Sequence, residues 1–361
     1  MPRSLFLDLA AQHHRLPIAV DLVLRRHADH EAILLNGERL GRVLAEAAAE
    51  FGTPLALPLM DLKLEKATLL PFFDVPSDEI DGFHFSTAPD ATAIAAFERA
   101  LPHAAPPPRV AANLGALRHL AAQPALVPVG MSIGPFSLAT KLLADPITPV
   151  YLAGSGVTAD DDPEVALLEA VAHLALVTVR HSVRAQLDAG ARAVFIAEPA
   201  ANRVFFSPKQ MAAGSDVFDR FALTPNRALA RELAARNADL IFHCCGELTD
   251  PMLDGFCMLR PAMLSLGSSR RLWEDAARVP KDIVLYGNLP SKQFYSDAQL
   301  PLEKLGALAT DLLERMQASG HPFILGTECD TLHVDGCADT IRAKVAHLLR
   351  LPAPATVPAH T

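Results

Sequence analysis

The sequence predicts an α/β fold, a single (β/α)8 barrel (TIM barrel) with a helical extension at the N-terminus. Short apolar segments of strand type alternate with amphipathic helical segments along most of the 361 residues, a pattern typical of a parallel sheet with crossover helices. The chain also lacks the Gly-x-Gly-x-x-Gly turn that indicates a dinucleotide-binding sheet. Seven or eight strand–loop–helix units on a chain of this length therefore favour one barrel domain.

The first part of the chain is expected to be mostly helical. The segment 37–50 has Ala, Leu and Glu at helical spacing, and we assign residues 1–50 to the N-terminal helical extension. A short buried strand over 55–60 follows, and Asp61 lies at its C-terminal end. Residues 62–70 are helical again. Residues 71–110 are rich in Pro, Asp and Ser and are expected to be loop-heavy.

From residue 111 the alternation becomes regular, and we assign residues 1–350 to the barrel domain. Strands are predicted at 126–133, 193–196, 240–242, 263–266, 283–286 and 323–325. Helices are predicted at 111–122, 136–143, 163–190, from Ser207-Pro208 onward, 225–236, 302–319 and 339–349. Residues 351–361 are expected to be a disordered tail.

Composition and charge exclude several classes of protein. Half of the residues are hydrophobic and 20% are charged, as in a globular protein. The net charge of −9 argues against nucleic acid or an anionic membrane as the main partner. The N-terminus lacks the apolar segment of a secretory signal, and the most apolar helical stretch, 167–179, is interrupted by Glu169 and His173 and is expected to be buried. Five sparse cysteines are no disulfide framework. A cytoplasmic protein with no membrane partner is therefore expected.

A metal site is indicated where the strand 240–242 ends in His243-Cys244-Cys245-Gly246. Because side chains alternate along an extended backbone, His243 and Cys245 lie on the same side of the strand. Chemistry sits at the C-terminal ends of barrel strands, so Cys329, after the last strand, is the natural third zinc ligand. Three protein ligands and one open position are typical of catalytic zinc. The alternatives are a buried His and Cys without metal, or the pair His333 and Cys337.

This set of ligands favours a particular chemistry. Two thiolates and a neutral His leave zinc with little net charge, and such a site still binds a further thiol. Coordination deprotonates that thiol near neutral pH while it stays nucleophilic. The natural reaction is attack on an activated methyl group, whereas hydrolytic zinc more often has His and carboxylate ligands.

At this point several segments of the chain resemble the uroporphyrinogen decarboxylase superfamily. More closely, they resemble its zinc-dependent, corrinoid-linked methyltransferase branch, which includes the methylcobamide:coenzyme M methyltransferases. The matching segments keep the family's order and cover most of the chain. They are Asp61 through Glu65, Gly130 through Ala139, Glu198-Pro199 with Ser207-Pro208, His243 through Gly246, Leu285 through Leu289, and Cys329.

The resemblance implies a barrel with zinc at its mouth, held by His243, Cys245 and Cys329. It implies that a methyl group moves between a corrinoid (cobalamin), often carried on a separate small protein, and a small-molecule acceptor or donor such as a thiol. We expect a monomer or homodimer. The expected catalytic residues are Asp61, which aligns with the decarboxylase's catalytic acid, and Glu198, whose other possible role is to hold a loop by hydrogen bonding. The expected substrate-binding residues are Met131, Asn288 and Glu328.

The chain departs from the family's pattern in two places. Relatives can carry an acidic zinc ligand near the strand after the His-x-Cys motif, but residues 265–269 here read Ser-Leu-Gly-Ser-Ser. We therefore expect water or substrate in the fourth position, or an acid from elsewhere such as Glu247 or Glu328. The loop around Cys329 reads Gly-Thr-Glu-Cys-Asp, where the coenzyme M enzymes have a Pro-Gly-Cys-Gly type of loop, so the acceptor stays open.

Three other functions compete. The first is porphyrinogen decarboxylation, a lyase reaction without metal, although the family's N-terminal Arg-Gln-Ala-Gly-Arg segment is missing here. The second is methyl transfer from a folate to homocysteine, whose enzymes share the barrel and the zinc motif but also use a Glu ligand that is not found at the expected place. The third is a zinc-binding structural or carrier protein, which an open barrel mouth disfavours because structural zinc usually has four protein ligands.

Overall fold

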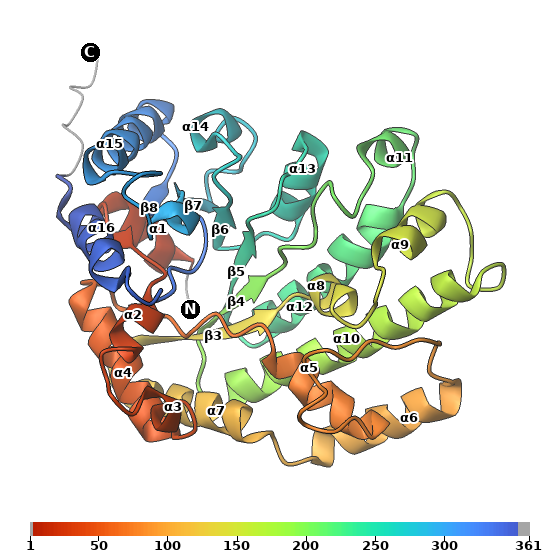
Figure 1. The fold of residues 1–361 in the computed structure, drawn as a ribbon. Helices are drawn as coiled ribbons and strands as arrows, with labels where there is room; N and C mark the ends of the chain where they lie inside the picture. The colour runs from red at the N-terminus through yellow and green to blue at the C-terminus, as the bar shows by residue number, and fades with distance from the viewer. Residues whose placement is uncertain (1–2, 353–361) are drawn as a thin grey trace.

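The computed structural model describes residues 3–352, and eight parallel strands form one sheet in the order β1-β8-β7-β6-β5-β4-β3-β2. That is the circular order of a (β/α)8 barrel. Among the described residues no ladder joins β1 to β2, so the sheet is open between them. The helices lie around the sheet (Figure 1).

The strands are short and almost wholly buried. Their bounds are β1 Arg15–Leu16, β2 Leu55–Ala56, β3 Val127–Ile133, β4 Ala193–Ala197, β5 Asp239–Cys244, β6 Met263–Leu266, β7 Val284–Leu289 and β8 Phe323–Thr327. Every predicted strand is therefore confirmed, within a few residues. The one addition is β1, which pairs with β8 from inside the segment assigned to a helical extension. Residues 1–50 thus contribute a strand to the sheet, and the sequence missed it because two residues show no periodicity.

Sixteen α-helices lie in the described part of the chain. Their bounds are α1 Ser4–Ala11, α2 Val20–Leu24, α3 His30–Ile33, α4 Gly37–Glu50, α5 Leu64–Leu69, α6 Ala91–Ala100, α7 Pro108–Ala121, α8 Pro135–Thr140, α9 Ile147–Gly154, α10 Pro163–Asp188, α11 Pro208–Ala212, α12 Thr224–Ala235, α13 Asp250–Met258, α14 Leu272–Asp275, α15 Leu302–Ser319 and α16 Ala338–Arg350.

The expectation of a loop-heavy region over 71–110 is wrong in part, because α6 and the first turn of α7 lie there. The side chain of Asp90 accepts a hydrogen bond from the backbone N–H of Ala93 and so caps α6. Proline-rich flanks hide this helix from the sequence pattern. Of the predicted tail, Leu351 and Pro352 are in neither helix nor strand, and the remainder lies outside the described residues.

By length and composition, α10 is the one described helix long and apolar enough to cross a membrane. Its buried side chains recur at helical spacing on one face, from Val165 through Leu168 and Val171 to Val183. That face packs against α8, α9 and β3 (Figure 1). The helix therefore buries one face and leaves the rest partly exposed, so the expectation of a buried helix is confirmed for that face only.

The register of the strands places the metal candidates at one end of the barrel. Met131, Phe195 and Ile241 are neighbours in one layer of the sheet. The layer above continues from Ala197 of β4 through His243 to Ser265 of β6. Residues after the strand ends extend this layer toward the mouth, where the βα loops meet.

Candidate metal centre

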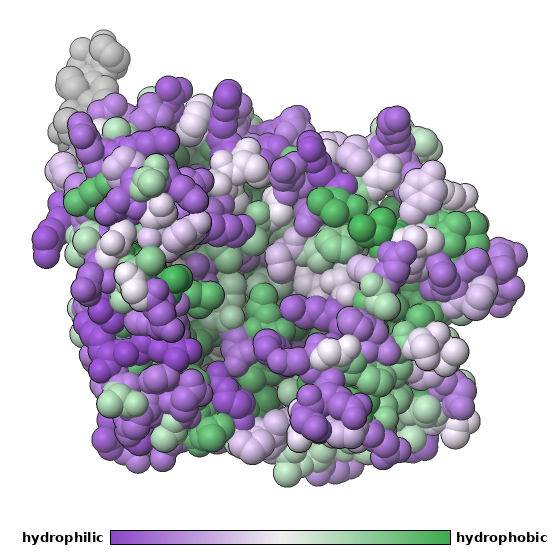
Figure 2. All heavy atoms as spheres, viewed as in Figure 1, coloured by the Kyte–Doolittle hydropathy of each residue, from purple (hydrophilic) through white to green (hydrophobic). Residues whose placement is uncertain are grey.

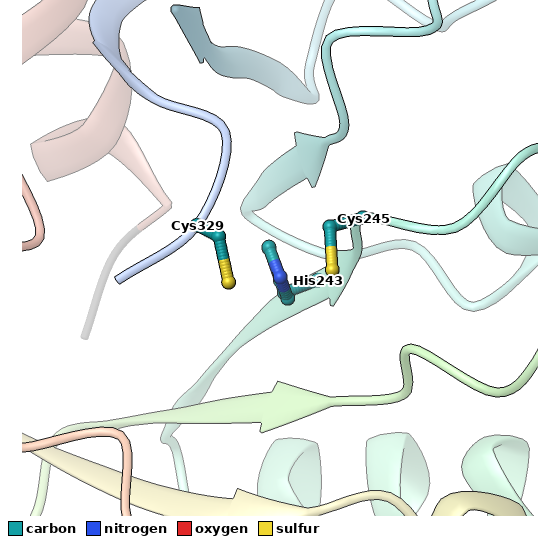
Figure 3. Close-up of side chains that lie close together, drawn as sticks. All are labelled: His243, Cys245 and Cys329. Carbon is teal, nitrogen blue, oxygen red and sulfur yellow. The ribbon is translucent and has the colours of Figure 1, made fainter. Parts of the chain in front are cut away.

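Three potential ligands meet at the mouth of the barrel. His243 lies near the end of β5, Cys245 is the first residue after β5, and Cys329 follows β8. One ligand atom from each lies within 4.8 Å of the other two. Figure 3 shows the three side chains close together, with Cys329 on one side of His243 and Cys245 on the other. The structure thus brings together the three metal ligands predicted from the sequence.

A serine of the next strand orients the imidazole ring of His243. Nδ1 of His243 lies 2.8 Å from Oγ of Ser265, the residue beside it in β6. Nε2 is buried and has no hydrogen-bond partner among the described residues. With the ring proton on Nδ1 and donated to the hydroxyl, Nε2 keeps its lone pair for a metal, the usual arrangement of a metal-binding His. Sequence analysis missed Ser265 because strand register is not visible in the sequence.

The two thiols influence each other's ionisation. A hydrogen bond from the Cys329 thiol, aided by His243, lowers the pKa of Cys245 to about 4. The same bond, together with burial, raises the pKa of Cys329. This hydrogen bond therefore favours a thiolate on Cys245 and a thiol on Cys329. Such a pair can supply two thiolates once a cation replaces the proton.

Backbone contacts hold both cysteines in place. The carbonyl oxygen of Cys329 accepts a hydrogen bond of 3.1 Å from the Ser291 hydroxyl, and Thr331 N donates to Ile18 O at 2.7 Å. On the other side, a Cβ at Gly267 would lie 2.5 Å from the carbonyl oxygen of Cys245. Only glycine lets the chain at the end of β6 approach the backbone of Cys245 so closely.

Neither acid considered for a fourth ligand belongs to the group of three ligand atoms. The carboxylate of Glu328 accepts hydrogen bonds from the hydroxyl and the backbone N–H of Ser268, at 2.6 and 3.1 Å. Glu247 is exposed and pairs with Arg203 at 2.8 Å. In the part of the chain that the structure describes, the cluster holds three ligand residues and no fourth.

Asp61 lies outside the cluster, in an ion pair. Its carboxylate accepts a hydrogen bond of 2.6 Å from Arg109 of α7, and both side chains are about a quarter exposed. The guanidinium group of Arg109 also donates to the carbonyl oxygen of Leu34 at 2.9 Å. Arg109 therefore fixes the direction of the Asp61 carboxylate, a contact that the sequence did not show.

Glu198 is fully buried and holds the start of α8. Its carboxylate accepts hydrogen bonds from the backbone N–H groups of Phe136 and Ser137, at 3.3 and 2.5 Å, and from Asn226 at 2.8 Å. Burial raises the pKa of Glu198 despite these bonds. The contacts favour the loop-holding role over contact with a substrate. A Cβ at Gly134 would lie 2.2 Å from this carboxylate, which explains the glycine there.

The remaining predicted residues lie on strands that line the barrel. Asn288 in β7 donates to the carbonyl oxygens of Gly267 and Arg270, at 2.7 and 2.9 Å, and so ties β7 to the loop after β6. Met131 in β3 lies beside Phe195, whose ring centroid is 5.4 Å from that of His243. Met131 thus lies one layer below the candidate ligand His243.

The other cysteines lie outside the cluster. Cys244 is fully buried on the opposite side of β5, as the alternation predicted, and burial strongly raises the pKa of its thiol. Cys257 is buried in α13, and burial raises its pKa to about 11. His333 contacts Asp335, and neither it nor Cys337 is among the three grouped ligands.

Comparisons with known proteins agree with this architecture. A family model described as uroporphyrinogen decarboxylase (URO-D) matches residues 86–344, well over half of the chain. No curated protein matches. Among solved structures, a methyltransferase from Methanosarcina mazei has 18% sequence identity and a TM-score of 0.62, and the match covers 93% of this chain and 91% of that chain. At this identity the likeness shows the fold.

Proposed function

The chain belongs to the uroporphyrinogen decarboxylase family, and from that premise we propose that it is a zinc-dependent methyltransferase. The methyl group moves between a corrinoid and a thiol or another small acceptor or donor. One observation carries the proposal, namely that His243, Cys245 and Cys329 bring one ligand atom each to within 4.8 Å of the others at the barrel mouth. The methyltransferase fold neighbour supports it.

The three residues fit a zinc ion. With Zn–S bonds of about 2.3 Å and Zn–N bonds of about 2.0 Å, ligand atoms in a tetrahedral site lie about 3.5–3.8 Å apart. The observed grouping is within 4.8 Å, so small side-chain rotations complete the site. The orphaned Nε2 of His243 is the polar atom that a metal would satisfy.

Bound zinc would supply an open position at which a thiol loses its proton and stays nucleophilic. Cys245 and Cys329 provide the negative charge of the site, and Ser265 holds the ring of His243 in the required orientation. Glu328 and Asn288 bond to the loop after β6 and so shape the wall on which a substrate rests. We propose that Asp61, whose carboxylate is oriented by Arg109, is a catalytic acid of this site.

The mouth also offers a surface for a corrinoid carrier protein. Large apolar side chains are exposed on the loops after β4, β7 and β8, with Val204, Tyr295 and Leu332 exposed by 60%, 41% and 56%. The face drawn in Figure 2 is hollowed at its centre, and apolar residues gather on it in the region of α9 and α11. We propose that these exposed side chains contact the carrier protein.

The test is to incubate the purified, zinc-loaded chain with free methylcobalamin and homocysteine, coenzyme M or tetrahydrofolate, and to follow loss of the methyl–cobalt absorption. The reverse assay uses cob(I)alamin with methoxylated aromatics or methylamines. We expect transfer with at least one partner, and Cys329→Ser to abolish it while Cys337→Ser retains it. Zinc-independent turnover, or equal rates in both variants, would contradict the proposal.

Decarboxylation is the second candidate, because the matching family model carries that name and the segment from Asp61 to Glu65 resembles the family's acidic segment after the first strand. It predicts release of CO2 from uroporphyrinogen, unchanged in Cys329→Ser and lost in Asp61→Asn. The methyltransferase proposal predicts no CO2 release. A folate-dependent homocysteine methyltransferase would instead turn over methyl-tetrahydrofolate without any corrinoid.

A further inference from the structure

A pocket of about 360 Å³ lies on the outer side of the barrel wall. It is bounded by α7 and α10, the helices that pack on each other and on β3 (Figure 1). The 3-10 helix Leu70–Phe73 and the segment 101–107, which leads into α7, form its other walls. Sites for small organic ligands begin at about 300 Å³, so the pocket has room for one such molecule.

Most of the pocket wall is apolar, and part of it is rigid. Val110 and Leu114 lie one turn apart on α7 and so present their side chains on one face of the helix. Pro106 and Pro107 belong to the segment before α7. Because proline fixes φ and lacks a backbone N–H, these two residues give a preformed surface without backbone donors. Such a wall favours a ligand with an apolar body, and binding orders little of the chain.

Arg118 is the one residue of the described pocket lining that carries a permanent charge. It lies one turn beyond Leu114 on the same face of α7, and it is exposed. Its guanidinium group forms no ion pair or hydrogen bond with a described residue. By contrast, Arg109 at the start of the same helix is held by Asp61 and by the carbonyl oxygen of Leu34. Arg118 thus keeps its fork of N–H donors for an anion, and a carboxylate matches that fork.

The surroundings of the pocket are positive, although the chain has a net charge of −9. Among the described residues, no acidic side chain lines the pocket. Glu65 accepts a hydrogen bond of 2.9 Å from the Ser182 hydroxyl, but it is 1% exposed, and burial raises its pKa, which favours the neutral form. Burial, and then the positive charge of Arg184, lowers the pKa of His181, which also lines the pocket. The ring of His181 is therefore uncharged at neutral pH and has an N–H to donate.

We propose that this pocket binds a small amphipathic monoanion, with its apolar body against Val110 and Leu114 and its carboxylate or similar group on Arg118. Burial of apolar surface supplies the driving force, and charge-assisted hydrogen bonds from the guanidinium group select the anion. The site is independent of the proposed methyl transfer, since no candidate zinc ligand lines it.

The test uses 3-phenylpropionate, 3-phenylpropanol and 3-phenylpropylammonium, which share one apolar body, and acetate, which has the negative charge alone. Each is titrated into the purified full chain, and isothermal titration calorimetry gives the affinities. We expect 3-phenylpropionate to bind about tenfold more tightly than each of the others, the effect of one charge-assisted contact. Equal affinity for any of the other three, or no measurable binding of 3-phenylpropionate, would overturn the proposal.

The ring of His181 reports whether the ligand enters this pocket. Its NMR signal is assigned with His181→Gln in a chain labelled with ¹³C at histidine. We expect 3-phenylpropionate to shift this signal in proportion to the bound fraction measured by calorimetry. Binding that leaves the His181 signal unshifted would contradict the location.

Two variants with matched controls separate the charge from the apolar wall. Arg118→Gln should weaken 3-phenylpropionate to the level of the alcohol, whereas Arg231→Gln, at an exposed position of α12, should leave its affinity unchanged. Ala185→Phe fills the apolar part and should weaken acid and alcohol alike, with Ala234→Phe on α12 as control. Parent-like binding by Arg118→Gln would overturn the assignment, and this surface variant decides the matter if Ala185→Phe does not fold. Cys329→Ser should bind 3-phenylpropionate like the parent, so failure of the zinc proposal leaves this result intact.

Discussion

Two polar clusters, one around Glu198 and one around His243, lie at the ends of adjacent strands. They differ in whether their donor and acceptor atoms already have hydrogen-bond partners. Glu198 follows β4 and His243 lies in β5, and the backbone N–H of Glu198 donates to the carbonyl oxygen of His243 at 2.8 Å. Three internal donors satisfy the buried carboxylate of Glu198. Nε2 of His243 has no hydrogen-bond partner in the part of the chain that the structure describes, and it lies near two thiols. Residue type and strand-end position are therefore shared by structural and ligand-binding clusters, and unused donor atoms distinguish them.

The largest expected difference between the clusters is in metal content. We expect Cys329→Ser to lose zinc and to lower activity by more than about a hundredfold, because even partners outside the ligand shell cost 10- to 100-fold. The midpoint of thermal unfolding should change little relative to metal-free parent, since the core does not depend on a residue at the mouth. Elemental analysis and the methyl–cobalt assay measure this, with Cys337→Ser as the matched thiol control. Full zinc retention in Cys329→Ser would remove it from the ligand set.

The Glu198 cluster should respond in the opposite way. Glu198→Ala leaves three buried donors unpaired, and we expect it to cost about 3 kcal/mol of unfolding free energy, since each such group costs about 1–3 kcal/mol. Zinc content should stay near one per chain. Chemical denaturation measures the loss, and Glu247→Ala at the exposed ion pair is the control that should change little. A Glu198→Ala variant that is as stable as the parent but inactive would instead indicate a catalytic role for Glu198.

The third prediction concerns Ser265, which hydrogen-bonds to a candidate zinc ligand but is not a ligand itself. Ser265→Ala removes the partner of Nδ1 in His243 and should weaken zinc binding about 10- to 100-fold without removing a ligand. Competition with a chelator measures the affinity. Ser268→Ala, which loses only a contact with Glu328, is the control. Equal zinc affinity in both variants would mean that the ring of His243 is held by packing alone.

The smallest expected effect is a pH dependence of stability. Burial raises the folded-state pKa of Glu198 above its ordinary value of 4.5. The contribution of Glu198 to the free energy of unfolding is therefore fully present below about pH 4.5. It declines as the pH rises through the folded-state pKa, by at most about 1.4 kcal/mol per pH unit. Glu198→Gln does not ionise, so its stability relative to the parent should improve with rising pH over that range. Chemical denaturation of both proteins at pH 4 to 8 measures this. A constant difference in unfolding free energy between the parent and Glu198→Gln over this range would contradict the prediction.

Much of the fold was predictable from the sequence because its signals are local. Apolar runs and strand-to-helix alternation located seven strands, and the spacing of His243 and Cys245 predicted that they share a side. The short strand β1 and the helices α6, α9, α13 and α14 were missed. The strand was missed because two residues show no period, and α6 because prolines surround it.

The partners of the site residues were not predictable in the same way. Ser265 reaches His243 through the pairing of β5 with β6, and Arg109 reaches Asp61 across 48 residues. Strand register and helix packing set these contacts, and neither leaves a mark on the local sequence. The sequence therefore indicates which residues have the chemistry, and the structure shows which of them remain free to use it.

We propose that His243, Cys245 and Cys329 bind one zinc ion with a position left open for a thiol. Zinc X-ray absorption on the purified chain tests it directly. We predict one zinc per chain with two sulfur neighbours at about 2.3 Å and one protein nitrogen at about 2.0 Å, and a third sulfur neighbour when a thiol acceptor is added. A chain without zinc, or a zinc shell that a thiol leaves unchanged, would contradict this assignment of the zinc site.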